Sequence, residues 1–164
     1  YSVTMSTDYR IRLATADDAA AISELVVTVA TAQLREEFTD DGWELFLRLI
    51  SRQTQQGLIA DTQFQYLVAC DKNAPQKIFG LLSSKHTTHV FHFFILPEYQ
   101  RLGIGTALWR HYLFHMPPGV GNTITVKSSD FACAFYLQLG FKQKQPRCIE
   151  NGLAYTLMHY TRDC

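Results

Sequence analysis

The spacing of hydrophobic residues near the start of the chain predicts a strand followed by two helices. Residues 9–13 alternate in side-chain character, as a strand does. Thr15 and Asp18 then form a capping-box pattern that starts a helix. Its apolar residues recur at i, i+3, i+4 and i+7, which places them on one buried face; they are Ile22, Leu25, Val26 and Val29. A second helix is expected from about Asp41, with apolar residues at the same spacing: Trp43, Phe46, Leu47 and Ile50.

From Phe64 onward the pattern changes to that of strands. Three β-rich runs follow one another as expected antiparallel strands; they span residues 64–69, 77–83 and 87–96. A helix comes next and ends at the breaker 117–119; its apolar spacing is carried by Ile104, Ala107, Leu108 and His111. The remaining elements are a strand at 123–126, a short helix at 130–139 capped by Gly140, and a final pair of strands from 141 and at 153–160. This order predicts one mixed α/β domain.

Composition narrows the class of protein. The chain has 164 residues, enough for one hydrophobic core. Lys plus Arg number 15 and Asp plus Glu number 15, so the net charge is zero and the basic footprint of a nucleic-acid or membrane-surface binder is missing. With 47% hydrophobic and 18% charged residues, the chain is not expected to be disordered.

The cysteines and the start of the chain indicate the compartment and the domain bounds. Four cysteines, at 70, 133, 148 and 164, form no C-x-x-C pair and are expected to be free thiols. No apolar run reaches the roughly 20 residues of a membrane-spanning helix, so we expect a cytoplasmic protein. Met5 is expected to be the native start, which gives a domain at 5–164 and leaves residues 1–4 as a cloning remnant or a frayed end.

The strongest chemical signal lies where the strand at 90–96 leads through a loop into the helix that follows Gly103. The unpaired N–H groups and the dipole at such a helix start favour a phosphate or diphosphate. Gly103 and Gly105 would let the backbone approach that ligand closely. Leu108 stands where a dinucleotide fingerprint needs its third glycine, and no P-loop lysine follows. Taken alone, the two glycines are equally compatible with a simple turn.

A second passage, residues 129–141, changes this interpretation. The sequence Gln100-x-x-Gly103-x-Gly105 resembles the diphosphate loop of the GNAT superfamily of acetyl-CoA-dependent N-acyltransferases. The passage from Ser129 to Phe141 resembles the Asn-x-x-Ala-x-x-aromatic-Tyr-x-x-x-Gly-Phe helix and turn of the same family. The two motifs stand in the family's order and spacing, and the order of elements from 9 to 160 also resembles that fold.

The resemblance implies a GNAT-like α+β fold and a cofactor site. The fold would have a central, mostly antiparallel mixed sheet of about seven strands, four helices, and fourth and fifth strands that splay apart. Acetyl-CoA would place its pantetheine arm along the fourth strand, its thioester near the backbone of Phe94 and Ile95, and its diphosphate at 101–106. The residues implied at the cofactor are Phe93, Phe94, Ile95, Gln100, Arg101, Leu102, Gly103, Ile104, Gly105, Thr106, Ser129 and Tyr136.

Tyr136 matches the family's catalytic tyrosine. A phenol with a pKa near 10 can donate a proton or a hydrogen bond to the departing CoA thiolate, whose thiol pKa is about 8.5. A purely structural interpretation competes, because Tyr136 also belongs to an apolar stripe with Ala132, Phe135 and Leu139. Ser129 stands where many relatives have asparagine, so it either contacts the cofactor weakly or caps the helix.

The proton acceptor stays open at this level. The fourth and fifth strands contain no Asp or Glu, which leaves His89, His92, Glu98 or a water relay. Strict alternation would point the two histidines to opposite faces of the sheet. No metal site is expected, because His86 with His92 and His111 with His115 are pairs without a third ligand of suitable spacing.

Together these features predict an acyltransferase that moves an acetyl group from acetyl-CoA to a primary amine of a small molecule or peptide by direct attack. A non-catalytic CoA-binding or ligand-sensing module and a protein-interaction domain are the alternatives. Acceptor selection is expected at the first two helices, whose acids either form a groove for a polyamine or face solvent; they are Glu36, Glu37, Asp40, Asp41 and Glu44. The last strands and the second helix could form a homodimer contact.

Overall fold

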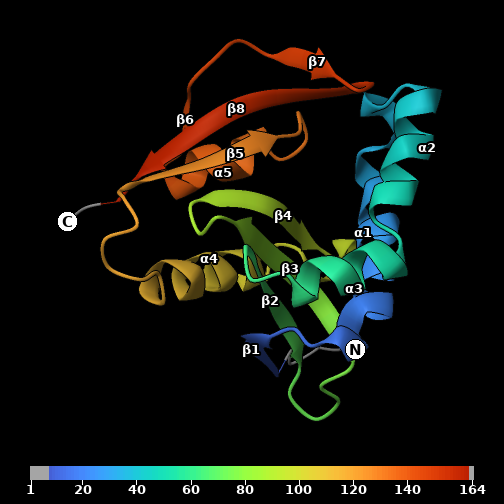
Figure 1. Ribbon diagram of the computed structural model, residues 1–164, viewed down its shortest axis with the longest axis vertical. Helices are drawn as coiled ribbons and strands as arrows, with labels where there is room; N and C mark the ends of the chain where they lie inside the picture. Colours follow the sequence, from blue (N-terminus) through green and yellow to red (C-terminus); the bar gives the residue numbers. More distant parts are fainter. Residues whose placement is uncertain (1–7, 163–164) are drawn as a thin grey trace, which may run out of the picture.

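The fold is built around one open sheet, which Figure 1 shows in the computed structural model. The structure describes residues 8–162, so the expectations for residues 1–4 and for the thiol of Cys164 lie outside the described residues. Eight strands lie within that range: β1 (Tyr9–Leu13), β2 (Phe64–Asp71), β3 (Ile78–Lys85), β4 (His89–Ile95), β5 (Thr123–Ser128), β6 (Lys142–Gln143), β7 (Cys148–Glu150) and β8 (Leu153–Thr161). The five α-helices within it are α1 (Ala19–Gln33), α2 (Asp40–Leu49), α3 (Arg52–Ala60), α4 (Ile104–Phe114) and α5 (Cys133–Leu139).

The strand order confirms the predicted mixed, mostly antiparallel sheet. The order is β1-β2-β3-β4-β5-β8-β6, and β7 pairs separately with β8. Every pairing is antiparallel except that of β4 with β5, which is parallel and limited to His89 with Thr125 and Val90 with Val126. Beyond Val90 the two strands diverge, as the opening between β4 and β5 in Figure 1 shows.

The helices cover both faces of the sheet. α1 and α3 pack on one face, where the predicted apolar stripe of α1, Ile22 to Val29, is fully buried against β2 and β3. α4 packs on the opposite face through Ile104, Leu108, Trp109 and Tyr112. The prediction that His111 continues this stripe is wrong: the larger aromatic rings take the inner positions, and His111 is half-buried at the edge. No helix in the described range is long and apolar enough to cross a membrane.

Helix α3 was not predicted, because it has few apolar residues and its one fully buried side chain, Gln55, is polar. Its sequence is RQTQQGLIA, and Ser51 caps its start by accepting the backbone N–H of Thr54 at 3.3 Å. Gln55 is buried, and its Oε1 accepts a hydrogen bond of 2.8 Å from the hydroxyl of Tyr66. Of the stripe predicted for α2, only Ile50, which follows the last residue of the helix, is fully buried; Trp43 and Phe46 are partly buried beside Phe38, and Leu47 is exposed.

A bulge in β4 decides which side chains share a face of the sheet. Ser83 of β3 pairs with His92, whereas the next residue, Ser84, pairs with Val90, so Phe91 is an extra residue in β4. Strict alternation predicted that His89 and His92 would face opposite ways, and this prediction is wrong. The bulge places both on the face covered by α1 and α3.

Candidate active site

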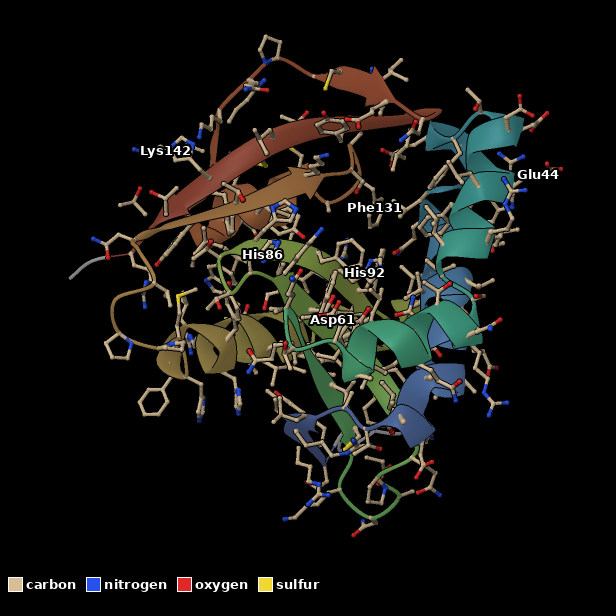
Figure 2. The ribbon with its side chains drawn as sticks, viewed as in Figure 1. Glu44, Asp61, His86, His92, Phe131 and Lys142 are labelled. Carbon is tan, nitrogen blue, oxygen red and sulfur yellow. The ribbon has the colours of Figure 1, made fainter. Side chains whose placement is uncertain are left out.

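The divergence of β4 and β5 opens a cleft of about 700 Å³. Two walls of different construction line it. We call one the α4 wall; its residues are Arg101, Gly103, Gly105, Thr106, Ala132, Phe135, Tyr136 and Gln138. We call the other the α2 wall; its residues are Leu34, Phe38, Phe46, Lys85, His89, His92, Lys127, Leu153 and Tyr155. In Figure 2, His92 on β4 and Phe131 after β5 lie on the two sides of the opening, and both line the cleft.

The first turn of α4 presents free backbone donors to the cleft. Gly103 is its N-cap with φ of +83°, in the left-handed region that glycine adopts without strain. The N–H of Ala107 donates to the carbonyl of Gly103 at 3.0 Å, which begins the hydrogen bonding of the helix. The N–H groups just before Ala107 therefore have no partner in the helix, and the helix dipole makes this end positive. Such an end suits a phosphate or diphosphate.

Gly105 has a packing role that the sequence did not indicate. A Cβ atom at this position would lie 3.1 Å from Cζ of Phe135. The missing side chain thus lets α5 pack closely on the start of α4. The predicted close approach of a cofactor at Gly105 stays a prediction.

Gln100 holds the loop through its side-chain amide. Its Nε2 donates to the backbone carbonyl of Ile95 at 3.0 Å and to Oε1 of Gln33 at 2.8 Å, and its Oε1 accepts from Nε2 of Gln33 at 3.0 Å. These three bonds tie the end of β4 to the end of α1. Both N–H groups of the amide are used, and the backbone N–H of Gln100 donates to the carbonyl of Pro97 at 3.2 Å, so Gln100 has no free N–H donor for a cofactor.

The structure brings ten of the twelve predicted cofactor residues to the cleft. They are Phe93, Phe94, Ile95, Gln100, Arg101, Gly103, Gly105, Thr106, Ser129 and Tyr136. Leu102 is half exposed and Ile104 is buried under α4, and neither lines the cleft. These two residues can offer a ligand only their backbone N–H groups.

Tyr136 has the packing role considered for it, and its catalytic role stays a prediction. Its ring is only 5% exposed and packs against Phe93, Phe135 and Phe141 with centroid distances of 6.1, 5.8 and 5.2 Å. The residue also lines the cleft. Burial raises the pKa of this phenol, so it stays protonated near neutral pH. The phenol therefore keeps the O–H group that the predicted hydrogen bond to a thiolate requires.

Ser129 caps the turn that leads into α5 rather than the helix itself, whose N-cap is Ala132. Its Oγ accepts the backbone N–H of Ala132 at 3.1 Å, just before α5 begins. Ser129 also lines the cleft, and a contact between its side chain and a cofactor stays a prediction.

The two histidines of the α2 wall are weak bases. His89 shares a hydrogen bond of 2.8 Å between its Nδ1 and Oγ1 of Thr125, and its pKa is lowered by burial and, to a smaller degree, by Lys127 and Lys85. Burial lowers the pKa of His92 to about 4, and its buried Nε2 has no partner among residues 8–162. Glu98 is exposed and lies outside the cleft. Both histidines are neutral at pH 7.

The α2 wall is fastened to the second half of the sheet by contacts that the sequence did not indicate. Phe38 forms an isolated bridge with Leu153, and a Cβ atom on Gly42 would lie 2.5 Å from the carbonyl oxygen of Gly152. The segment between α1 and α2 therefore docks on the turn between β7 and β8. The only local signal for this contact is the pair of glycines.

Glu37 makes a second contact between the segment that joins α1 to α2 and the loop that follows β5. Its carboxylate accepts the backbone N–H groups of Asp130 at 2.7 Å and Phe131 at 3.3 Å. The Asp130 carboxylate in turn accepts two bonds from Nε of Arg147, at 2.9 and 3.1 Å, and one from Nη2 at 2.9 Å. These bonds connect the start of α2, the loop after β5 and the β6–β7 segment.

The acids near α2 do not form a groove. Glu36, Asp40, Asp41 and Glu44 are exposed, and Figure 2 shows Glu44 on the outer side of α2. No Asp or Glu lines the cleft within residues 8–162, so the solvated-face interpretation holds. The same range contains no group of three or more His, Cys, Asp and Glu side chains placed to hold a metal ion.

Comparison with known proteins agrees with this architecture. Residues 34–162 match the family model described as the acetyltransferase (GNAT) domain, and the chain belongs to this family. No curated protein matches the chain in sequence.

Solved structures share the fold over nearly the whole chain. A GCN5-related N-acetyltransferase from Rhodopseudomonas palustris aligns with a TM-score of 0.77 and 21% identity, covering 98% of this chain and 99% of that one. The PaiA N-acetyltransferase of Thermoplasma acidophilum, in complex with coenzyme A, aligns with a TM-score of 0.77 and 16% identity, covering 93% and 98%. A spermidine N-acetyltransferase SpeG variant from Vibrio cholerae aligns with a TM-score of 0.65 and 16% identity, covering 96% and 95%.

Proposed function

We propose that this protein transfers an acetyl group from acetyl-CoA to a primary amine by direct attack. The observation that carries the proposal is the start of α4, whose free N–H groups open into the cleft between β4 and β5. The coenzyme A complex of PaiA supports the choice of cofactor. Family membership supports acetyl transfer as the reaction.

The backbone of β4 offers a place for the rest of the cofactor. β4 pairs with β3 along one edge, whereas its other edge pairs with β5 only at His89 and Val90. The edge from Phe91 to Ile95 therefore carries N–H and C=O groups that can bond the amides of a pantetheine arm, as a strand partner would. With the diphosphate at 101–106, the thioester would lie near Phe94 and Ile95.

The reaction follows from these positions. The amine nitrogen attacks the thioester carbonyl carbon, and a β4 backbone N–H stabilises the oxygen that becomes negative. The C–S bond then breaks, the sulfur leaves with its electron pair, and Tyr136 donates a hydrogen bond to it. The nitrogen loses one proton and the sulfur gains one, so the products are the N-acetyl amine and CoA-SH.

The group that takes the proton from the nitrogen is not assigned to one residue. His89 and His92 both reach the cleft but are weak bases, so a water relay that either of them orients would serve equally well. These weak bases and a cleft without carboxylates also favour the second candidate, a CoA-binding module without catalysis. The predicted cytoplasmic location and homodimer stay predictions.

Calorimetric titration of the purified protein with acetyl-CoA tests the proposal first. We expect saturable binding at one site, followed by release of CoA thiol when suitable amines are added. No binding at high concentration, with or without amines, would exclude the cofactor site and favour an interaction domain. Binding without thiol release on a broad amine panel would favour the non-catalytic module.

A further inference from the structure

We infer that the acceptor is a small amine that also carries a carboxylate and an apolar group, such as an apolar or aromatic amino acid, rather than a polyamine. The inference rests on the proposed function, because it assigns the acceptor to the α2 wall of the same cleft. It is carried by the charges of that wall and by the side chains that surround them.

Every charged side chain that lines the cleft within residues 8–162 is a cation: Lys85, Arg101 and Lys127. Arg101 belongs to the loop before α4, where the cofactor diphosphate is proposed, so two lysines remain for the acceptor. A substrate with several ammonium groups would be repelled by this wall and would find no carboxylate in it. A substrate carboxylate would be attracted.

The two lysines lie on one face of the sheet. Lys85 of β3 lies opposite His89 of β4. The His89 ring is hydrogen-bonded to the side chain of Thr125 in β5. Lys127 follows Thr125 by two residues in β5 and so faces the same way. The lowered pKa of His89, to which both lysines contribute, is consistent with a positive field at this point.

The lysines differ in how far their charge is neutralised. Lys127 lies 3.7 Å from a carboxylate oxygen of Glu150, and its ammonium is 4.9 Å from the ring centroid of Tyr155. Lys85 has no carboxylate within ion-pair distance in the described range and lies 5.6 Å from the ring centroid of Phe64. Lys85 is therefore the main candidate to bind an acceptor carboxylate, with Lys127 adding to the field.

The rest of the α2 wall is apolar. The rings of Phe38 and Phe46 pack in a tilted arrangement with a centroid distance of 4.9 Å, and Leu153 pairs with Phe38. All three line the cleft and are supplied by α2, its preceding segment and β8. They offer a surface to a hydrocarbon or aromatic side chain. A carboxylate at Lys85 and an apolar side chain at Phe38 and Phe46 together describe an apolar α-amino acid more closely than a linear polyamine.

The test compares acetylation rates within matched sets of amines. Each apolar and aromatic amino acid is assayed beside its carboxamide and its decarboxylated amine, and spermidine is included as the polyamine. We expect at least one free acid to exceed its carboxamide in kcat/KM by roughly tenfold, as a hydrogen bond to a charged group provides. If no acid exceeds its amide, or if spermidine is the best acceptor, the inference is wrong although acetyl transfer stands. If no amine is acetylated, the proposed function fails first.

Variants at Lys85 assign the effect to this wall. K85Q should reduce the preference for the acid over the amide to near unity, K85R should keep it, and K85E should reverse it toward cationic amines. K77Q is the matched control, because Lys77 also lies beside an aromatic ring, 5.7 Å from the Phe79 centroid, but outside the cleft. Acetyl-CoA affinity, measured by calorimetry, should be equal in all four variants. An unchanged acid preference in K85Q would overturn the role of Lys85.

Discussion

The two walls of the cleft are built by opposite means. The α4 wall comes from two continuous segments, 100–106 and 129–141, and its binding groups are backbone N–H donors at a helix start. The α2 wall gathers side chains from five separate elements or their connections and depends on a bulge in β4. The α4 wall can therefore be recognised from a local sequence motif. The α2 wall forms only in the folded chain, because its residues come from segments that are far apart in the sequence.

Their electrostatics differ in the same way. The positive end of α4 comes from peptide dipoles, which carry no titrating group. The positive charge of the α2 wall comes from lysine side chains, which substitution can remove or reverse. Cofactor binding should therefore be insensitive to changes that alter acceptor choice, and the reverse should hold as well.

The largest expected effect belongs to Tyr136. The Y136F variant should lower kcat by about 100- to 1000-fold, because it removes the hydrogen bond to the leaving sulfur, while the Kd for acetyl-CoA should change little. Steady-state kinetics with calorimetry measures both quantities. Tyr160 packs against Phe141 in the same core but does not line the cleft, so Y160F is the control and should keep kcat. Equal losses of kcat and cofactor affinity in Y136F would indicate a packing role alone.

His92 should make stability depend on pH. Its pKa in the folded chain is about 4, against an ordinary value of 6.5, so between these values the unfolded chain binds a proton that the folded chain does not. The free energy of unfolding should therefore fall by about 3 kcal/mol from this group as the pH decreases from 6.5 to 4, with no further loss below.

Urea unfolding of the wild type and H92Q at pH 7 and pH 5 measures this effect. The variant should lose less stability than the wild type over that interval. Exposed His86 provides the control, and H86Q should follow the wild type. A wild-type decrease that H92Q fully retains would show that His92 titrates normally.

Glu37 joins the α2 wall to the start of the 129–141 segment, and its loss should affect the acceptor side of the cleft rather than the loop before α4. E37A removes the carboxylate that accepts the N–H groups of Asp130 and Phe131, and it should lower the free energy of unfolding by about 1–2 kcal/mol. Because the α2 wall is loosened, the KM for the acceptor should increase while the Kd for acetyl-CoA stays the same. Glu36 is exposed beside it, and E36A should change neither. Weakened cofactor binding in E37A would break the separation of the two walls.

The smallest effect is expected on the α4 wall. G103A forces alanine into the left-handed region, at φ of +83°, which should cost about 1 kcal/mol of stability and weaken acetyl-CoA binding without changing the acceptor KM. Gly57 lies within helix α3 with open space around it, so G57A should instead stabilise the protein by up to about 1 kcal/mol. Thermal melts and calorimetry distinguish the two variants. Equal changes of stability in G103A and G57A would show that the backbone at position 103 accepts a side chain without strain.

The sequence predicted the fold where hydrophobic spacing controls it. Strand β1 and the buried stripe of α1 were correctly placed, because Ile22 and Val29 bury a continuous apolar face. Helix α3 escaped prediction because its stability depends on a contact of Gln55 with Tyr66, which lies on another element. Propensity alone does not contain such a tertiary contact.

The same distinction applies to the site. The segment from Gln100 to Thr106 could be placed at the cleft because the end of a strand and the start of a helix are joined there by consecutive residues, and its binding of a diphosphate stays a prediction. The acceptor side was only expected near the first two helices, and Lys85 and Lys127 were not singled out at all. The two lysines come close together only because β3, β4 and β5 pair with one another, and no local sequence pattern indicates this pairing. The acids of α2, which the sequence left open, turned out to face solvent.

The extra residue at position 91 shows that the pairing with β3, and not the number of residues in β4, decides which side chains form the α2 wall. Replacing Phe91 by another residue would leave the register of β4 unchanged, so His89 and His92 would still share a face. Deleting it would remove the bulge but keep Val90 opposite Ser84 and His89 opposite Lys85, so the two histidines, then two residues apart in a regular strand, would also share that face. The polar surface would be lost only if residue 91 itself took the place opposite Ser84, because His89 would then turn to the α4 side and Val90 toward the cleft.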